Sequence, residues 1–114
     1  DVYKRQNKGF YHEGEIIRKF IASQPNMYIV CGDRHWQHVT KHQDYGIVEF
    51  SIGANSDDHA SGWNQEDVRP EHLYLNVVGG TMTVTIDPKG KGSISVVHYG
   101  VDGNELNKFV ATAE

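Results

Sequence analysis

The chain has 114 residues, which is enough for one domain with a core of modest size. Its formal net charge of -4 and its sequence pI near 5.9 argue against a surface dedicated to nucleic acid, which would be basic. No apolar stretch approaches the roughly 20 residues of a membrane-spanning helix, and a single cysteine, Cys31, excludes an internal disulfide. We therefore expect a small domain with neither a nucleic-acid nor a membrane partner.

The first six residues, Asp1–Gln6, show neither a helical nor a strand period. They resemble a translated adapter sequence, so we expect a non-native or disordered tail and leave it out of the fold. A native polar tail is the alternative. The domain itself is expected to comprise residues 7–114.

A helix is predicted over Glu13–Gln24, because Ile16, Ile17, Phe20 and Ile21 recur along one face at helical spacing. Acidic residues at its start and basic residues further along suit the helix dipole, and a proline follows it. We expect this helix to pack its apolar face on a sheet and to have no catalytic role.

An apolar run, Met27–Cys31, follows and stops at Gly32, which predicts a buried strand with Cys31 as a small core residue. Asp33 and His35 come directly after it. Ligands of layered α/β proteins bind at the carboxyl ends of strands, so these two residues are the first candidates for chemistry. Residues two apart on an extended segment point to the same side, so Asp33 and His35 could converge on one ion.

An imidazole paired with a carboxylate suits zinc, iron or manganese, and carboxylate oxygen also suits calcium. Two ligands do not complete a site, because structural zinc has four protein ligands and catalytic zinc has three plus water. The others must come from elsewhere in this chain or from sequence that it lacks. The structural alternative is a strand-end aspartate in a turn beside a half-exposed histidine.

A second apolar strand is predicted over Ile47–Ile52, ending at Gly53. The intervening segment Val39–Tyr45 is polar and is interpreted as a connection. If the second strand lies next to the first, Ala54–His59 reaches the same rim of the sheet as Asp33.

A long loop is predicted over Asn55–His72, and loops of this length in compact domains are often functional. Trp63 is expected to anchor the loop by packing. The triplet Asp57–His59 could complete a metal site, but a turn or helix-cap cluster with solvated charge is the preferred interpretation.

The last third of the chain predicts antiparallel strands. Apolar residues alternate over Leu73–Val77 and Met82–Ile86, with two glycines between them, which predicts a hairpin. Turns at Asp87–Gly92 and Asp102–Gly103 extend this into a meander. His98 falls in its middle and is expected to be a hydrogen-bonded sheet histidine.

A resemblance to a known family rests on three segments: Gly32–Gln37, Val48–Ala54 and Ser56–Trp63. Together they resemble the C-terminal part of alkaline phosphatase D-like (PhoD-like) metallophosphatases, which belong to the calcineurin-like group of dinuclear metal phosphoesterases. The resemblance extends over about residues 7–110, and the first segment is its specific part. The last metal-binding motif of the wider group is Gly-His-x-His, and the sequence here, Gly-Asp-Arg-His, looks like the PhoD-like version.

The resemblance implies a partial αββα sandwich, with one N-terminal helix on a mixed sheet followed by an antiparallel β-meander. It implies hydrolysis of a small phosphate mono- or diester by metal-activated hydroxide, with calcium, iron, zinc or manganese as the ions. Asp33 and His35 would be metal ligands. Arg34, Trp36 and Gln37 would bind substrate.

His38, just after the motif, is the candidate catalytic residue, because a histidine free of metal could protonate the leaving oxygen. The other metal motifs of the family lie upstream and are absent here. We therefore expect a C-terminal fragment that acts with the upstream part of the same polypeptide and is inactive, or nearly so, by itself. The family is mostly exported, which suggests a periplasmic or extracellular location.

Two other functions stay open. One is a non-catalytic α/β domain in which the Gly-Asp-Arg-His turn is structural. The other is a single-ion binding module that uses Asp33, His35 and the Asp57–His59 loop.

Overall fold

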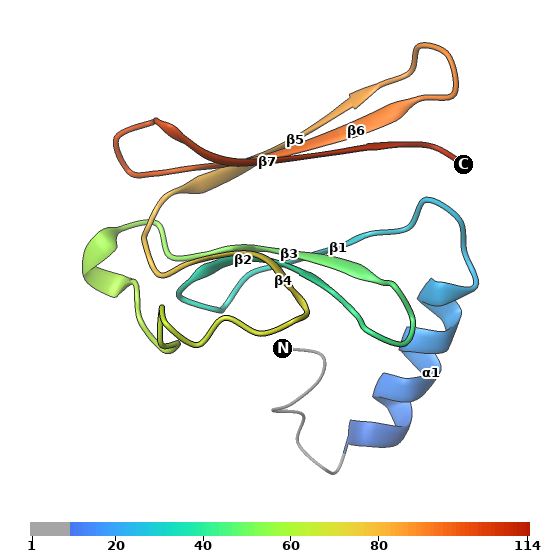
Figure 1. Cartoon of the computed structure of the whole chain (residues 1–114), viewed down its shortest axis with the longest axis horizontal. Helices are drawn as coiled ribbons and strands as arrows, with labels where there is room; N and C mark the ends of the chain where they lie inside the picture. The colour runs from blue at the N-terminus through green and yellow to red at the C-terminus, as the bar shows by residue number, and fades with distance from the viewer. Residues whose placement is uncertain (1–9) are drawn as a thin grey trace.

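The computed structural model describes residues 10–114, so the expected tail at residues 1–6 lies outside the described range. The elements follow in chain order: α1 (Tyr11–Ala22), β1 (Ile29–Cys31), β2 (Gln37–Lys41), β3 (Val48–Ile52), the 3-10 turn η2 (Asp57–His59), β4 (His72–Asn76), β5 (Thr81–Asp87), β6 (Ser93–Tyr99) and β7 (Glu105–Thr112). The strands form a mixed four-stranded sheet in the order β1-β3-β2-β4 and an antiparallel three-stranded sheet in the order β5-β6-β7. Figure 1 shows the two sheets as stacked layers, with α1 beside the four-stranded one. The expected mixed α/β architecture is confirmed at this level.

The first two predicted strands are neighbours, as expected. β1 pairs with β3 in parallel, from Ile29 opposite Glu49 to Cys31 opposite Ser51. Both strands therefore end at the same edge of the sheet, where Gly32 follows β1. This edge is where the sequence predicts chemistry.

The interpretation of Val39–Tyr45 as a connection is wrong, because its first residues belong to a central strand. β2 pairs with β3 on one side and with β4 on the other, both antiparallel. Its sequence, Gln-His-Val-Thr-Lys, has one strongly apolar residue and so lacks the pattern of a buried strand. The side chains of Gln37 and His38 have hydrogen-bond partners, which lets these polar residues lie inside the fold.

The predicted hairpin between Leu73–Val77 and Met82–Ile86 is also wrong, because β4 and β5 lie in different sheets. The glycines between them allow close backbone contacts. A Cβ atom on Gly79 would lie 2.2 Å from the carbonyl carbon of Ser56, and one on Gly80 would lie 1.8 Å from the carbonyl oxygen of Tyr99. The chain thus crosses between the layers here, and only β5, β6 and β7 form the expected meander.

The core lies between the sheets and is built on Val39, Phe50 and Val96, which are at most 1% exposed. The rings of Phe50 and Phe109 pack edge to face at 5.1 Å. His98 is fully buried, and its Nε2 donates a hydrogen bond to the carbonyl oxygen of Ser51 at 2.8 Å. The prediction of a hydrogen-bonded sheet histidine is confirmed, and this bond joins the two sheets.

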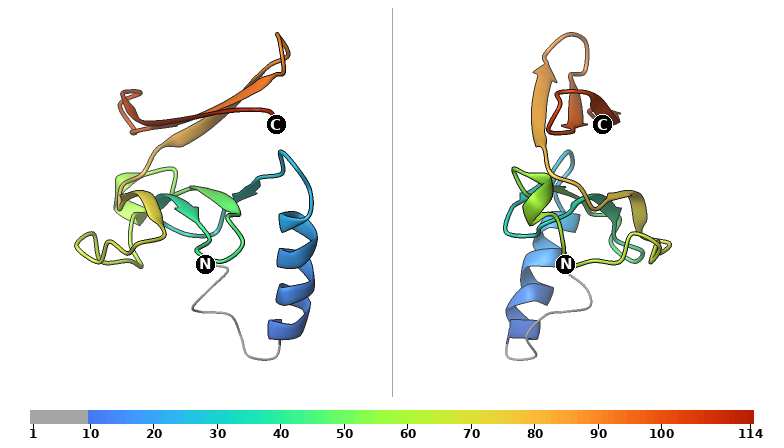
Figure 2. Two further views of the ribbon diagram at one scale, coloured as in Figure 1. Left: turned by 45° about the vertical axis from the view of Figure 1, so that its right-hand side comes forward. Right: turned by 90° about the vertical axis from the view of Figure 1, so that its left-hand side faces the viewer.

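The helix forms where it is predicted, but its apolar face does not pack on a sheet. Ile16, Ile17 and Phe20 are 56–58% exposed, whereas Arg18 is buried. Glu15 accepts hydrogen bonds from Arg18 at 2.6 and 2.8 Å and from the Tyr45 hydroxyl at 2.9 Å. Polar contacts to the turn after β2 therefore hold α1 at the side of the molecule (Figure 2).

Other apolar side chains that face the space between the sheets are also uncovered. Val30, Val84 and Ile86 share the inner faces with Phe50, Val96 and Ile94 by register, and they are 57%, 45% and 73% exposed. The core is thus closed at its centre and open at its margin.

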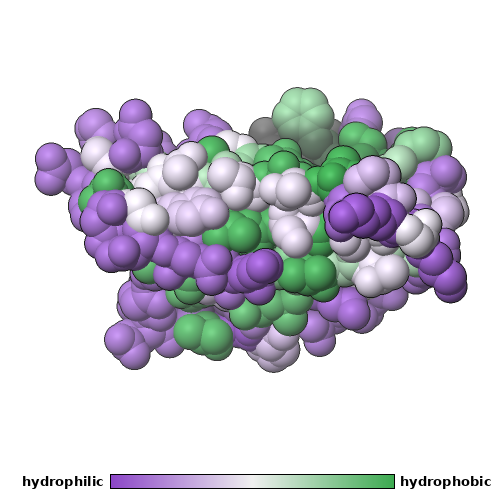
Figure 3. Space-filling model, turned by 90° about the horizontal axis from the view of Figure 1, so that it is seen from above, coloured by the Kyte–Doolittle hydropathy of each residue, from purple (hydrophilic) through white to green (hydrophobic). Residues whose placement is uncertain are grey.

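No α-helix of residues 10–114 covers the outer face of the three-stranded sheet. Figure 3 looks onto that face, where hydrophobic residues gather in the middle and hydrophilic ones at the two ends. In the part of the chain that the structure describes, no helix is long and apolar enough to cross a bilayer.

Candidate functional site

The predicted motif forms the connection between β1 and β2. Asp33 has a positive φ of 68°, in the left-handed region that glycine, asparagine and aspartate adopt more readily than other residues. The chain therefore turns at Asp33, so the expectation of an extended segment at Asp33–His35 is wrong. The side chains of Asp33 and His35 are exposed. The backbone carbonyl of His35 accepts a hydrogen bond from the Ser61 amide at 3.0 Å, which ties the turn to the long loop.

The exposed turn, defined as Gly32–His35, provides two potential metal ligands at the edge where β1 and β3 end. Within residues 10–114, the one group of three Cys, His, Asp or Glu ligands whose atoms lie within 4.8 Å of one another is elsewhere. The turn by itself is therefore an incomplete metal site. The assignment of Asp33 and His35 as ligands stays a prediction.

Arg34 and Trp36 connect the turn to the long loop. The Arg34 guanidinium lies 5.5 Å from the centroid of the Trp36 ring, within the range of a cation–π contact. Trp36 is buried against Trp63, with ring centroids 5.5 Å apart. Trp63 in turn packs under Arg69 at 4.7 Å and donates from Nε1 to the carbonyl oxygen of Asp67. Trp63 therefore anchors the loop by packing, as predicted.

Gln37 is fully buried and uses both ends of its amide. Its Nε2 donates to the carbonyl oxygen of Tyr99 at 3.0 Å, and its Oε1 accepts from the Tyr74 hydroxyl at 2.9 Å. The bond to Tyr99 joins the two sheets, and the bond from Tyr74 lies within the four-stranded sheet. The predicted contact of Gln37 with substrate would require them to break.

His38 and Glu49 form a buried pair on neighbouring strands. His38 Nε2 lies 3.2 Å from Glu49 Oε1, and both side chains are 4% exposed. Burial alone would raise the pKa of Glu49, but several interactions, among them hydrogen bonds with His38 and Cys31 and the charge of His38, hold that pKa below its ordinary value. The predicted role of His38 as an acid toward a leaving group would need substrate to reach this buried position.

Cys31 completes a group that the sequence interpretation missed. Cys31 and His38 both lie opposite Ser51 in the register, and Glu49 precedes Ser51 by two residues on β3. Side chains that are paired or two apart share a face of a sheet, so Cys31, His38 and Glu49 project from the outer face of the four-stranded sheet. Their ligand atoms all lie within 4.8 Å of one another. We call these three residues the Cys-His-Glu group.

The environment of the Cys31 thiol is partly apolar and partly acidic. Burial raises the pKa of the thiol, and the neighbouring charge of Glu49 raises it further. The signal that could have identified the group is Glu49 itself, because an acidic residue in the middle of a predicted buried strand needs a partner.

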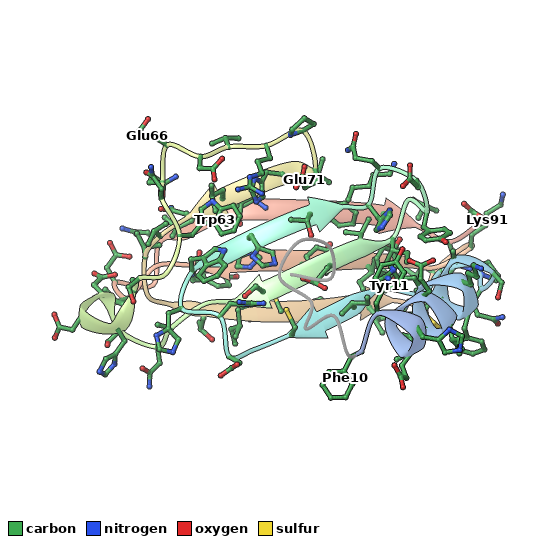
Figure 4. All side chains as sticks on the ribbon, turned by 90° about the horizontal axis from the view of Figure 1, so that it is seen from below. Phe10, Tyr11, Trp63, Glu66, Glu71 and Lys91 are labelled. Atoms are coloured by element: carbon green, nitrogen blue, oxygen red, sulfur yellow. The ribbon has the colours of Figure 1, made fainter. Side chains whose placement is uncertain are left out.

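A small cavity lies against His38 and Glu49 under the long loop, whose residues Trp63, Glu66 and Glu71 are labelled in Figure 4. Its volume of about 20 Å³ matches a single water molecule. It is lined by Trp36, His38, Thr40, Glu49, Trp63, Arg69, Glu71 and His72. Two of these carry buried polar atoms, His38 Nδ1 and Thr40 Oγ1, that have no hydrogen-bond partner among the described residues.

The loop residues Asp57–His59 form the exposed turn η2. Asp57 Oδ1 accepts a hydrogen bond from the Gly79 amide at 2.9 Å, and His59 Nδ1 lies 3.1 Å from the Ser56 hydroxyl. The preferred interpretation of these residues as a turn cluster is confirmed.

The structure thus separates residues that the sequence interpretation grouped. Asp33 and His35 lie in the exposed turn, while His38 is buried with Cys31 and Glu49. No protein-family model matches this sequence, and no solved structure matches it significantly.

Proposed function

We propose that this chain contributes one metal-binding strand end to a PhoD-like phosphoesterase that hydrolyses small phosphate mono- or diesters. The observation that supports the proposal is the position of the exposed turn, at the edge where the parallel strands β1 and β3 both end. Crevices at the carboxyl ends of strands are the usual ligand sites of layered α/β proteins.

The residues of the turn fit the chemistry of such a site. Asp33 offers carboxylate oxygen and His35 offers imidazole nitrogen, which suits calcium, iron, zinc or manganese. Bound ions would supply a hydroxide nucleophile and neutralise charge on the phosphoryl oxygens. Arg34 lies over the Trp36 ring beside the ligands, where its guanidinium would bind phosphate oxygens.

The remaining ligands, and the rest of an αββα sandwich, would come from the upstream part of the same polypeptide. The uncovered apolar side chains of α1 and of the sheet margins support this, because exposed apolar patches mark interaction surfaces. β1 is also an edge strand, with one neighbour among the described strands, and its free edge could accept another strand.

The alternative of a single-ion module built from Asp33, His35 and η2 has less support. Asp57 already accepts a hydrogen bond from the Gly79 amide, and His59 already lies at hydrogen-bond distance from the Ser56 hydroxyl. Recruiting them to an ion would break these contacts.

The test is metal analysis and turnover of p-nitrophenyl phosphate by the chain joined to its upstream reading frame. Asp33→Ala should remove one ion per molecule and lower turnover by at least about 100-fold, since even groups that only orient a ligand are worth 10- to 100-fold. Asp58→Ala is the matched control, because Asp58 is an exposed aspartate on η2.

Unchanged metal content in Asp33→Ala would remove this residue from the site. The 114-residue chain alone should be inactive, or nearly so, on the same ester. Robust metal-dependent turnover by this chain alone would contradict the proposal that the other ligands come from upstream.

A further inference from the structure

We infer that Cys31, His38 and Glu49 form a second metal site, a mononuclear site for a zinc-type transition-metal ion, separate from the exposed turn. The three residues come from the three adjacent strands β1, β2 and β3 and project from one face of the sheet. A site carried by hydrogen-bonded strands is held more precisely than one carried by loops.

The separations of the ligand atoms suit such an ion. Ligands of a tetrahedral zinc site lie about 3.3 to 3.7 Å apart, given metal–ligand distances of 2.0 to 2.3 Å. His38 Nε2 and Glu49 Oε1 are already 3.2 Å apart, and the Cys31 sulfur lies within 4.8 Å of one ring nitrogen of His38 and one carboxylate oxygen of Glu49. Small side-chain movements would bring the three atoms around one ion.

The set of ligands selects the class of metal. A thiolate with an imidazole and a carboxylate favours zinc, cobalt or iron(II), whereas calcium and magnesium prefer oxygen alone. Thiolate and carboxylate together carry two negative charges beside a neutral imidazole, and a divalent cation bound by all three would neutralise both charges.

The unpartnered atoms beside the group provide the supporting observation. With Nε2 on the ion, the Nδ1 atom of His38 would carry the ring proton and need an acceptor, as metal-bound histidines almost always have. His38 is 3% exposed and its Nδ1 has no partner among the described residues, nor does the Thr40 hydroxyl. Both residues line the cavity of about 20 Å³, so one water there could accept from Nδ1 and bond to Thr40 Oγ1.

Three protein ligands leave one position for solvent or another small ligand, the arrangement that catalytic zinc sites share. The inference assigns His38 to metal binding in place of proton transfer to a leaving group. It does not depend on the phosphoesterase proposal, which concerns Asp33 and His35.

The test is titration of the 114-residue chain with cobalt(II), followed by absorption spectroscopy, with zinc(II) as competitor. One equivalent of cobalt should give a thiolate-to-cobalt charge-transfer band in the near ultraviolet, and zinc should abolish it. Cys31→Ser should remove the band, and Glu49→Gln should weaken binding at least about 10-fold. Circular dichroism would check that each variant is folded.

The matched control is Asp33→Ala combined with His35→Ala, which should keep the band and the affinity. Loss of the band in this double variant, or an unchanged band in Cys31→Ser, would overturn the inference, as would the absence of a thiolate band in the unaltered chain.

Because Glu49→Gln could disturb folding, Thr40→Val is a second probe and should weaken cobalt binding several-fold with the band retained. Failure of the phosphoesterase proposal would instead appear as metal retention in Asp33→Ala of the extended protein.

Discussion

The exposed turn begins at Gly32, directly after Cys31 of the Cys-His-Glu group, yet the surroundings of the two regions differ. In the exposed turn, the candidate ligands Asp33 and His35 are exposed to solvent, and no group of three ligands within the described range includes them. The Cys-His-Glu group has a partner on each of three strands and lies mostly out of solvent. Strand register therefore predicts better than proximity in sequence which side chains lie together in a site, because hydrogen bonds between strands fix which side chains meet.

The largest expected difference between the two regions is in stability. His38→Ala removes a buried partner of Glu49, so the free energy of unfolding should fall by about 3 to 5 kcal/mol. His35→Ala, in the exposed turn, should change it by less than about 0.5 kcal/mol. Urea denaturation of the metal-free proteins measures both, and equal losses would contradict the distinction between the regions.

A smaller effect is expected from pH at the buried histidine that joins the sheets. Burial lowers the pKa of His98 from its ordinary 6.5, although its bond to the Ser51 carbonyl opposes the shift. The folded state therefore binds fewer protons than the unfolded one, so stability is complete above pH 6.5 and falls as pH drops below it. The contribution is at most about 1.4 kcal/mol for each pH unit.

His98→Gln should remove this part of the pH dependence while keeping a donor for Ser51. The measurement is the free energy of unfolding at neutral pH and at about pH 5. A slope in the variant equal to that of the unaltered chain would assign the acid sensitivity to other groups.

The smallest change in stability is expected from substitutions on the apolar face of α1. Ile17 is 57% exposed, so Ile17→Ser should change the free energy of unfolding of this chain by less than about 0.5 kcal/mol beyond helix propensity. A loss of 2 kcal/mol or more, as in a core truncation, would show that this face is covered in solution.

Local patterns predicted much of the fold. The helix, the strands β1 and β3, and the meander of β5, β6 and β7 were all predicted from apolar periodicity and turn residues, and they form close to their expected bounds. Each depends on signals within a dozen residues, such as the alternation on both sides of Asp102–Gly103.

The errors concern residues whose partners lie far away in the sequence. β2 is buried although mostly polar, because Gln37 bonds to Tyr74 and Tyr99, and His38 bonds to Glu49. The crossing at Gly79–Gly80 has a turn-like sequence but carries the chain between layers. The helix leaves its apolar stripe exposed, while Glu15 on the same helix accepts a hydrogen bond from the Tyr45 hydroxyl after β2.

The sequence by itself determined where α1, β1, β3 and the strands of the meander lie, and that an acid and a histidine follow the first strand, because backbone preferences and apolar periods act locally. Only the tertiary structure decided that this strand end turns outward, and that Cys31, His38 and Glu49 meet on one face. The reason is register: which strands pair, and at which residues, depends on hydrogen bonds and packing between distant segments.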